Sequence, residues 1–408
     1  MPLLIGMPSR SRPAADGPHQ GTVAHVVRRF GELSECFVTE LVEELEHAGW
    51  RAQVVAMAVS NRDRFPFPPD ERLLRAQRPA PARRLGDRLA LRSSAERRSS
   101  WLRAPLAASG AQLAHAHFGW AAADARLAAR RLGLPLVATF HGSDLTAPIG
   151  RGRRRDYARL FAQLDHAIAV SSFLERKLRA LGYDGPVDVI PGGVRLEQVP
   201  FRAPRAPDGP VRVLFVGRQI DCKGLDVLLR SSARLRHAGA DVRLEVVGDG
   251  PARAANEALA EALALAGTVT FRGALPKDEV VAALARSDVL VAPSRTSARG
   301  QAEGRSVVAM EALAAGLPVV ATDNGGLPET VPPRYRDELV PEGDDAALSD
   351  RILALIAERA SWPERARAGR AWAEREFDSA TLATRVAAIY SDVLDRRAER
   401  KFAVGAAV

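Results

Sequence analysis

Cysteine is almost absent from this chain of 408 residues, which contains only Cys36 and Cys222. A disulfide framework or a cysteine-rich zinc site is therefore excluded. Long hydrophobic runs are also lacking. Residues 2–7 form the longest early run, which is too short for a signal-peptide core, and no run approaches the ~18 residues of a membrane-spanning helix. We therefore expect a soluble cytoplasmic protein rather than a secreted scaffold or an integral membrane protein.

Lysine is scarce as well, because only four of the 58 basic residues are lysine and the remainder are arginine. Arginine, alanine, leucine, proline and glycine are abundant together, as the codon usage of a GC-rich genome would impose. Part of the net charge of +9 is then a matter of codon usage and says little about binding partners. The charge alone is therefore weak evidence for a polyanionic partner.

The basic excess is uneven along the chain. Residues 72–103 hold ten arginines against Asp87 and Glu96, and residues 151–155 form a second basic run. Two interpretations of residues 72–103 stay open: a surface that touches an anionic membrane or acceptor, or a solvated helical face. Nucleic-acid binding is not expected, because Trp101 is the only aromatic residue there and stacking needs several.

Short apolar segments alternate with amphipathic segments of 10–15 residues along the first half of the chain. This alternation is typical of βαβ units and a parallel sheet. The predicted strands are 22–28, 53–59, 113–117, 135–140, 167–170 and 187–190, and the predicted helices are 36–48, 121–132 and 172–181.

A second alternating series follows the proline-rich residues 201–210. Its predicted strands are 211–216, 243–247, 269–271, 289–292 and 318–321, with helices at 225–237, 252–265, 277–286, 306–315, 346–358, 362–376 and 380–397. We therefore expect an α/β protein of two doubly wound, Rossmann-like domains that face each other across a cleft. The expected parts are a tail (1–20), an N-terminal domain (21–200), a linker (201–210), a C-terminal domain (211–376), a helix that crosses back to the N-terminal domain (377–397) and a tail (398–408).

Two glutamates flank the start of the helix predicted near residues 307–315. Ser306 is a suitable N-cap, so Glu303 and Gly304 lie where unpaired amides favour an anion. Glu311 follows Glu303 by eight residues, or about 12 Å along a helix. That separation exceeds the ~5–9.5 Å of a glycosidase pair, and it suits carboxylates that hold opposite ends of an extended ligand. Taken alone, such a pair is more often two helix-surface charges.

Cations and glycines follow the strands of the same half. Arg218 and Lys223 come after the strand 211–216, where a guanidinium and an ammonium group can bind phosphate oxygens. Gly217 precedes Arg218, and tight turns at Gly248 and Gly273 follow two further strands, where either allows a planar base to approach the backbone. Each motif is weak alone, and together they predict a phosphate-containing ligand at this edge.

In combination, these motifs resemble the nucleotide-binding domain of retaining glycosyltransferases of family 4, which have the GT-B fold. The resemblance covers most of residues 211–350. The first half matches more loosely, through residues 30–37, 115–119 and 139–144, and is similar to bacterial enzymes that build colanic-acid-like exopolysaccharide. It departs from the family at Gly192-Gly193 and in a first-half loop without the usual paired glycines.

The resemblance implies a role for each matching residue. Arg218 and Lys223 would neutralise the donor diphosphate, and Glu311 would bind the ribose. Glu303 would hold hydroxyls of the transferred sugar, and His141 would face the donor sugar and the acceptor. The donor-binding set implied in this way is Gly217, Arg218, Lys223, Gly248, Gly273, Glu303, Gly304, Arg305, Ser306 and Glu311, with His141 and Glu303 catalytic.

Several residues keep two interpretations. His141 is either a site residue or a structural histidine, and Asp144 either contacts acceptor hydroxyls or caps a turn. Ser34 and Glu35 either face the acceptor or begin the helix at residue 36. His115 and His117 share one face of a strand and so hint at a metal, but with no third ligand nearby we expect packing or cleft lining. No metal is expected at the diphosphate, because no D-x-D motif is present.

The expected function is transfer of a sugar, with retention of configuration, from a nucleotide-diphosphate sugar to a hydroxyl of a glycan or lipid-linked acceptor. Cell-surface or exopolysaccharide biosynthesis is the expected setting, with no cofactor and with possible peripheral contact at the inner face of the cytoplasmic membrane. The alternatives are a sugar-nucleotide epimerase or phosphorylase of the same fold, and a non-catalytic nucleotide-sugar-binding protein.

Overall fold

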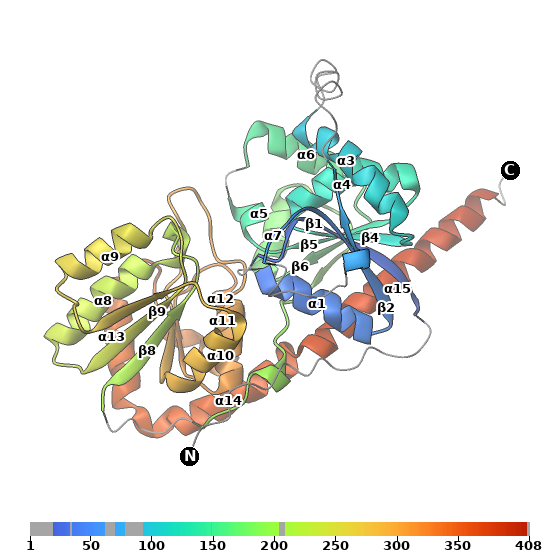
Figure 1. Ribbon diagram of the computed structural model, residues 1–408. Coiled ribbons are helices and arrows are strands. Elements are labelled where there is room, and N and C mark those ends of the chain that lie inside the picture. Colours follow the sequence, from blue (N-terminus) through green and yellow to red (C-terminus); the bar gives the residue numbers. More distant parts are fainter. Residues whose placement is uncertain are drawn as a thin grey trace.

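Two lobes, each built around a parallel β-sheet, make up the protein in a computed structural model (Figure 1). The structure describes residues 19–32, 35–61, 70–77, 93–147, 149–203 and 209–405. The N-terminal lobe contains a seven-stranded sheet and the C-terminal lobe a five-stranded one. The predicted fold class, two doubly wound Rossmann-like domains, is therefore confirmed.

The N-terminal sheet has the strand order β3-β2-β1-β4-β5-β6-β7. Its strands are β1 (Gly21–Phe30), β2 (Trp50–Val59), β3 (Leu73–Arg75), β4 (Leu113–His117), β5 (Leu136–Phe140), β6 (His166–Ala169) and β7 (Val187–Val189). Its helices are α1 (Cys36–His47), α3 (Ser94–Ala108), α4 (Gly119–Leu132), α5 (Ser143–Thr146), α6 (Arg151–Phe161) and α7 (Ser172–Ala180). The order reverses between β1 and β4, where ligands of doubly wound sheets bind.

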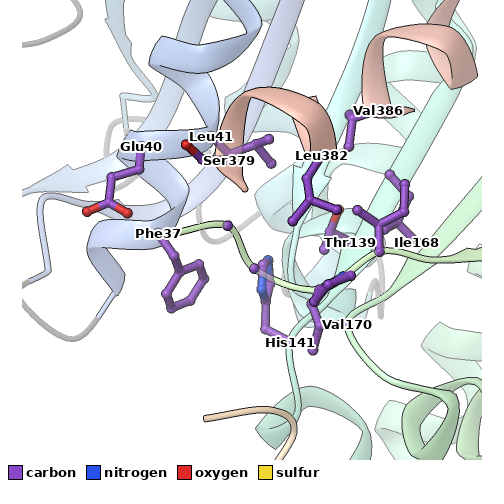
Figure 2. A pocket seen from close by; sticks show the side chains of 14 residues that line it. Phe37, Glu40, Leu41, Thr139, His141, Ile168, Val170, Ser379, Leu382 and Val386 are labelled. Atoms are coloured by element: carbon purple, nitrogen blue, oxygen red, sulfur yellow. The ribbon is translucent and has the colours of Figure 1, made fainter. Parts of the chain in front are cut away.

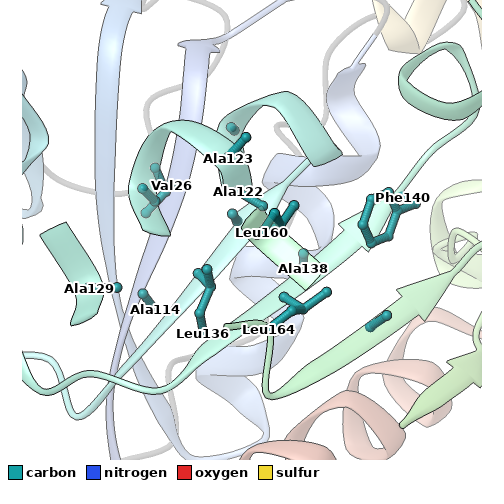
Figure 3. Close-up of a cluster of buried hydrophobic side chains, with 14 of the residues drawn as sticks. Val26, Ala114, Ala122, Ala123, Ala129, Leu136, Ala138, Phe140, Leu160 and Leu164 are labelled. Carbon is teal, nitrogen blue, oxygen red and sulfur yellow. The ribbon is translucent and has the colours of Figure 1, made fainter. Parts of the chain in front are cut away.

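Small side chains let α4 lie close to one face of this sheet (Figure 3). Ala122 and Ala125 of this helix are fully buried against Ala114 and Ala138 of the strands. Because alanine keeps the helix near the sheet, the strand ends that follow β4 and β5 are held on a close-packed support.

The C-terminal sheet has the order β10-β9-β8-β11-β12. Its strands are β8 (Val211–Val216), β9 (Val242–Val247), β10 (Val269–Gly273), β11 (Val289–Ala292) and β12 (Val319–Ala321). Its helices are α8 (Leu225–His237), α9 (Arg253–Ala262), α10 (Lys277–Arg286), α11 (Val307–Ala315), α12 (Leu327–Thr330), α13 (Asp345–Ala357) and α14 (Trp362–Glu376). Short 3₁₀ segments lie at Asp70–Arg72, Leu196–Gln198, Asp221–Lys223, Pro333–Glu338 and Arg359–Ser361.

The last helix, α15 (Ser379–Gly405), runs from the C-terminal lobe onto the N-terminal sheet (Figure 1). Tyr390 and Val386 of this helix are buried with Trp50 and Leu113 of the N-terminal lobe. The sheet therefore has α3, α4 and α6 on one face and α1 and α15 on the other.

Two chain segments cross between the lobes side by side. The amide of Val194 donates to the carbonyl of Phe377 at 2.7 Å, and the amide of Ser379 donates to the carbonyl of Val194 at 3.1 Å. The outward and return crossings are therefore joined by backbone hydrogen bonds.

The predicted end of the last helix at residue 397 is wrong, because α15 continues to Gly405. The predicted tail at 398–408 is therefore helical over most of its length. No proline or glycine occurs between Ser379 and residue 404, so nothing in the sequence stops the helix earlier. The predicted tail at 1–20 and linker at 201–210 fall largely outside the described residues.

The basic segment at residues 72–103 is described only at its two ends. There, Arg72 pairs with Glu46 at 2.6 Å, and Arg98 pairs at 2.8 Å with the buried Asp124. These two arginines therefore form ion pairs within the N-terminal lobe. None of the helices in the described ranges combines the length and apolar character that a bilayer crossing requires.

Candidate active site

Glycine-rich turns join the ends of β8, β9 and β10. The amide of Gly217 donates to the carbonyl of Val247 at 3.0 Å, and the amide of Gly248 donates to that of Gly273 at 2.7 Å. Gly248 has a φ of +126°, and a Cβ there would lie 1.9 Å from the Gly217 carbonyl oxygen. Only glycine fits this position, so the turns form one tightly packed floor. A donor contact at these glycines stays a prediction.

Lys223 and Glu303, predicted to bind the diphosphate and the sugar, contact each other. Lys223 ends the 3₁₀ turn before α8, and its Nζ forms an ion pair with Oε2 of Glu303. The hydroxyl of Ser294 donates to the same oxygen at 3.1 Å. The Glu303 side chain is only 9% exposed. The Lys223 ammonium group and the Glu303 carboxylate, which come from separate sequence motifs, therefore meet at one partly buried site.

The loop that carries Glu303 also touches the other lobe. A Cβ at Gly304 would lie 2.1 Å from the carbonyl oxygen of His141 and 2.9 Å from the Cα of Gly142. The backbones of the two lobes are therefore in direct contact beside the Lys223–Glu303 pair. His141 and Glu303, the two predicted catalytic residues, are brought together at this junction.

The imidazole of His141 lies among aromatic rings. Its centroid is 4.8 Å from Phe37, 4.6 Å from Phe118 and 5.7 Å from His117. Burial, helped by His117, lowers the pKa of His141 well below its usual value, so the ring is neutral at physiological pH. Its Nε2 is buried and has no hydrogen-bond partner among the described residues. A neutral ring with an unused nitrogen can accept or donate a hydrogen bond to a ligand.

A cavity of about 30 Å³ lies beside His141 (Figure 2). Phe37 and Glu40 of α1 and Leu382 and Val386 of α15 form its walls with His141. Its lining includes none of the predicted charged donor-binding residues. The cavity therefore extends the site on the side of the N-terminal lobe.

Arg218 and Glu35 act on each other electrostatically across the junction. Glu35 is partly buried, and burial, with Glu32 and Asp144, raises its pKa to about 7, while Arg218 and Arg29 lower it. Arg218 is exposed. Glu35 occupies the N-cap position of α1, but its side chain makes no capping bond. Ser34 lies outside the described residues.

Replacing Glu35 by glutamine is expected to stabilise the protein at pH 8 by about 2 kcal/mol. The pKa of about 7 in the folded chain exceeds the ordinary value of 4.5, so the folded state binds more protons between these values. Wild-type stability therefore falls as the pH rises through this window. The full shift corresponds to about 3 kcal/mol, which partial exposure reduces.

Urea denaturation at pH 4 and pH 8 measures this difference. At pH 4 the carboxyl is mostly protonated in both states, so the variant and the wild type should have nearly equal stability. Glu197→Gln, at an exposed position in the 3₁₀ segment Leu196–Gln198, is the matched control and should show no pH-dependent gain. A gain for Glu35→Gln of the same size at both pH values would contradict the raised pKa.

Glu311, predicted to bind the ribose, forms an ion pair with Lys277. Glu311 lies in α11 and is 4% exposed, and Lys277 is the first residue of α10. Glu40 of the other lobe binds the same ammonium group at 3.2 Å. Burial raises the pKa of Glu311, whereas Glu311 and Glu40 outweigh burial and raise that of Lys277. Lys277 was not predicted, although a rare lysine in an arginine-rich chain was a usable signal.

Two other predicted site residues have structural partners. The buried carboxylate of Asp144 accepts hydrogen bonds from the amides of Gly119, His141 and Gly142, which joins two strand-end turns. The Ser306 hydroxyl caps α11 by accepting from the amide of Ala309. These contacts match the turn-stabilising interpretation of Asp144, and an acceptor contact stays a prediction.

Arg305 and Glu329 connect the lobes. The Arg305 guanidinium is 8% exposed and donates to the carbonyls of Val170 and Glu329 at 3.3 and 2.8 Å. Burial lowers its pKa to about 10. The carboxylate of Glu329 accepts from the amides of Ser172 and Phe173 at the start of α7. The Arg305 side chain therefore fixes the junction, and donor contact through its backbone amide stays a prediction.

The assumption that His115 and His117 have no third ligand nearby is wrong. β1 and β4 are parallel neighbours, and His25 pairs in register with His115. The sequence did not indicate that His25 lies beside His115, because the two residues are 90 positions apart.

Two doubly wound lobes that meet at the carboxyl ends of their strands define the GT-B class. The family described as "Glycosyltransferase Family 4" matches residues 34–198, and that described as "Glycosyl transferases group 1" matches residues 199–375. The chain belongs to glycosyltransferase family 4.

Curated relatives agree with this assignment, and a solved structure shares the fold. The chain is 32% identical to the amylovoran biosynthesis glycosyltransferase of Erwinia amylovora over 64% of its own length and 65% of that protein's length. It is 32% identical to the 2-deoxystreptamine glucosyltransferase of Streptomyces kanamyceticus, over 68% of this chain and 76% of that one. The Anabaena protein HepE, solved with UDP and glucose, is 19% identical and superimposes with a TM-score of 0.73 over 91% of this chain and 100% of its own.

Proposed function

We propose that this glycosyltransferase moves a sugar, with retention of anomeric configuration, from a nucleotide-diphosphate sugar to a hydroxyl of a glycan or lipid-linked acceptor. The observation that carries the proposal is the Lys223–Glu303 pair, which lies at the contact between Gly304 and His141. The Anabaena neighbour solved with UDP and glucose supports a nucleotide sugar as the donor. The amylovoran relative supports an exopolysaccharide as the product.

Donor binding replaces the Lys223–Glu303 ion pair by one contact of each side chain with the donor. The diphosphate takes the Lys223 ammonium from Glu303, and Glu303 is then available to accept hydrogen bonds from sugar hydroxyls. The exposed Arg218 supplies a second cation. These positive charges stabilise the negative charge that develops on the leaving diphosphate in the transition state, which accelerates bond breaking. No metal cofactor is proposed for this step, because the two side chains supply that charge.

Retention is proposed through attack on the same face from which the diphosphate leaves. Lys223 and Ser294 bind the Glu303 carboxylate from one side, which suits a hydroxyl-binding group more than a nucleophile. The acceptor would enter beside His141, whose ring faces the cavity (Figure 2). Contact between the lobes excludes water from the breaking bond and so favours transfer over hydrolysis.

The proposal is tested by a thermal-shift screen of UDP-, GDP- and ADP-sugars with the full chain. A ligand that binds only the folded state raises the melting temperature. NMR of the product with a glycan acceptor then reads the anomeric configuration. Transfer with retention is expected. Stabilisation without transfer to any acceptor would favour a binding protein, donor conversion without acceptor would favour an epimerase, and an inverted product would contradict retention.

Replacing His141 by alanine is expected to leave donor affinity within about threefold and to lower kcat by about 10²-fold or more, the range of acid–base and positioning groups. The reason is that its imidazole packs among rings of the N-terminal lobe, whereas Lys223 and Glu303 belong to the C-terminal lobe. Calorimetry and steady-state kinetics separate the two effects. His237→Ala, in α8 of the C-terminal lobe, is the control and should change neither. Equal losses in affinity and kcat would contradict the role of His141 in turnover.

Peripheral membrane contact through residues 72–103 belongs to the same proposal. The arginines at 78–92 lie outside the described residues, and Arg72 and Arg98 are already paired with acidic side chains. The membrane charge would therefore come from the remaining arginines of the segment, among them the exposed Arg75 and Arg103. Sedimentation with anionic and neutral vesicles tests this contact, and equal binding to both would contradict it.

A further inference from the structure

Three histidine side chains meet on the face of the N-terminal sheet that α15 covers. His25 comes from β1, and His115 and His117 come from β4, two residues apart and therefore on one face. The parallel register places His25 opposite His115. One ring nitrogen from each histidine lies within 4.8 Å of the other two. Three imidazoles are thus gathered within the dimensions of one coordination sphere.

All three side chains are buried, with exposed fractions of 0–1%. Nδ1 of His25 lies 3.2 Å from Nε2 of His117. The other nitrogens of these two rings, His25 Nε2 and His117 Nδ1, have no partner among the described residues. An ion would bind the two facing nitrogens, His25 Nδ1 and His117 Nε2, in place of the hydrogen bond between them.

The spacing of the nitrogens fits a metal ion. Two imidazole nitrogens bound at ~2.0–2.1 Å in a tetrahedral arrangement lie about 3.3–3.4 Å apart, close to the separation between His25 and His117. Imidazole is a preferred ligand of zinc, copper and nickel ions. Three histidines leave a fourth position for water or hydroxide, which offsets part of the charge of the ion.

The third ring is already oriented by neighbours. His115 contacts the Tyr390 hydroxyl through Nδ1 at 2.5 Å and the Thr139 hydroxyl through Nε2 at 2.7 Å. Metal-bound histidines are typically fixed by a hydrogen bond from the nitrogen that does not bind the metal. On metal binding, His115 exchanges one of its two contacts for the ion and keeps the other. Thr139 also lines the cavity beside His141, so the cluster lies next to that cavity.

We propose that His25, His115 and His117 bind one divalent transition-metal ion, with Zn²⁺ as the best fit to their ligand type and spacing. The site joins β1 to β4 and, through the contact between His115 and Tyr390, connects the sheet to α15. Its role is structural. The proposal does not depend on the sugar-transfer activity proposed above, because none of the three residues is assigned to donor binding.

The first test is metal content and cobalt spectroscopy on the tag-free full chain. Protein stripped with a chelator is titrated with Zn²⁺ or with Co²⁺, whose four-coordinate complexes absorb strongly in the visible range. The expected result is one equivalent of bound ion per chain, the visible cobalt bands, and a melting temperature several degrees higher with Zn²⁺ than after chelation. A chain that binds no stoichiometric ion, with the same melting temperature in both conditions, would overturn the proposal.

Variants then locate the ion. His25→Gln is expected to weaken Zn²⁺ binding at least 100-fold and to abolish the cobalt bands. His166→Gln, a buried histidine on β6 that pairs with Asp188 outside the cluster, is the matched control and should bind normally. Unchanged binding by His25→Gln would overturn the assignment to this cluster. If that variant does not fold, His117→Gln answers the same question, and the wild-type cobalt spectrum stands on its own.

Discussion

Replacing Gly304 by alanine is expected to lower kcat/KM by about 100-fold or more while leaving both lobes folded. The new methyl carbon would lie 2.1 Å from the His141 carbonyl oxygen and 2.9 Å from the Gly142 Cα. Both neighbours are backbone atoms that cannot turn away, so the lobes must separate at the site. A displacement of about 1 Å between reacting groups can lower a rate about 100-fold.

The stability of this variant should change little, because Gly304 belongs to none of the hydrophobic clusters of the described residues. Gly152→Ala is the matched control, since residue 152 lies in α6 with open space where its Cβ would be. Alanine in that helix should be neutral or stabilise the protein by up to about 1 kcal/mol. Steady-state kinetics and thermal melting compare the two variants. Wild-type kcat/KM in Gly304→Ala would mean that the closed junction is not the conformation that reacts.

Replacing Lys223 by alanine is expected to weaken nucleotide-sugar binding about 30- to 100-fold. A hydrogen bond to a charged group contributes about 1.5–3 kcal/mol, and tenfold in affinity corresponds to about 1.4 kcal/mol. The loss is compounded by Glu303, because its carboxylate is 9% exposed and would face the donor without a counterion. Titration calorimetry with the best donor from the thermal-shift screen measures the change.

A double variant separates these two contributions. In Lys223→Ala with Glu303→Gln, the repulsion between carboxylate and diphosphate is removed, so part of the affinity should return relative to Lys223→Ala alone. Lys177→Ala, on α7 of the other lobe, is the control and should bind the donor normally. Unchanged affinity in Lys223→Ala would show that the diphosphate binds elsewhere. No recovery in the double variant would contradict the coupling of the two side chains.

The parts of the fold that follow a strong periodic pattern were predictable from the sequence. The strands Val211–Val216 and Val289–Ala292 and the helices Leu225–His237 and Lys277–Arg286 have the predicted bounds. Each contains a run of apolar residues with a clear period, bounded by glycine, proline or polar residues. The alternation of such segments was sufficient to predict the two parallel sheets.

Elements with weak patterns were missed. The sequence did not predict α3 or α6, and these helices bury few apolar side chains: Leu102 and Leu106 in α3, and Tyr157 and Leu160 in α6. Their remaining positions are largely polar or arginine, so the helical period is faint. Both are stabilised mainly by packing across α4 and by ion pairs, which a local pattern does not reveal.

The candidate site was predictable where its residues follow strand ends within one lobe. Lys223 and Glu303 are 80 positions apart, yet both lie at the carboxyl edge of one sheet, where the topology brings side chains together. Lys277 and Glu40 could not be paired in advance, because they belong to different lobes and the relative placement of the lobes is not a local property. The contact of Glu329 with α7 could not be predicted either, because it also joins the two lobes.

The paired crossings at Val194 and Phe377 restrict how this protein can move. A single connecting segment would allow one lobe to rotate relative to the other in every direction. Two crossing segments that are hydrogen-bonded to each other allow fewer relative rotations of the lobes. Opening then becomes rotation about a single axis, with hinge residues that absorb the change in backbone angles. Each time the lobes close, Gly304 should therefore return to the carbonyl of His141. The backbone of the crossing segments then determines how the reacting groups are aligned.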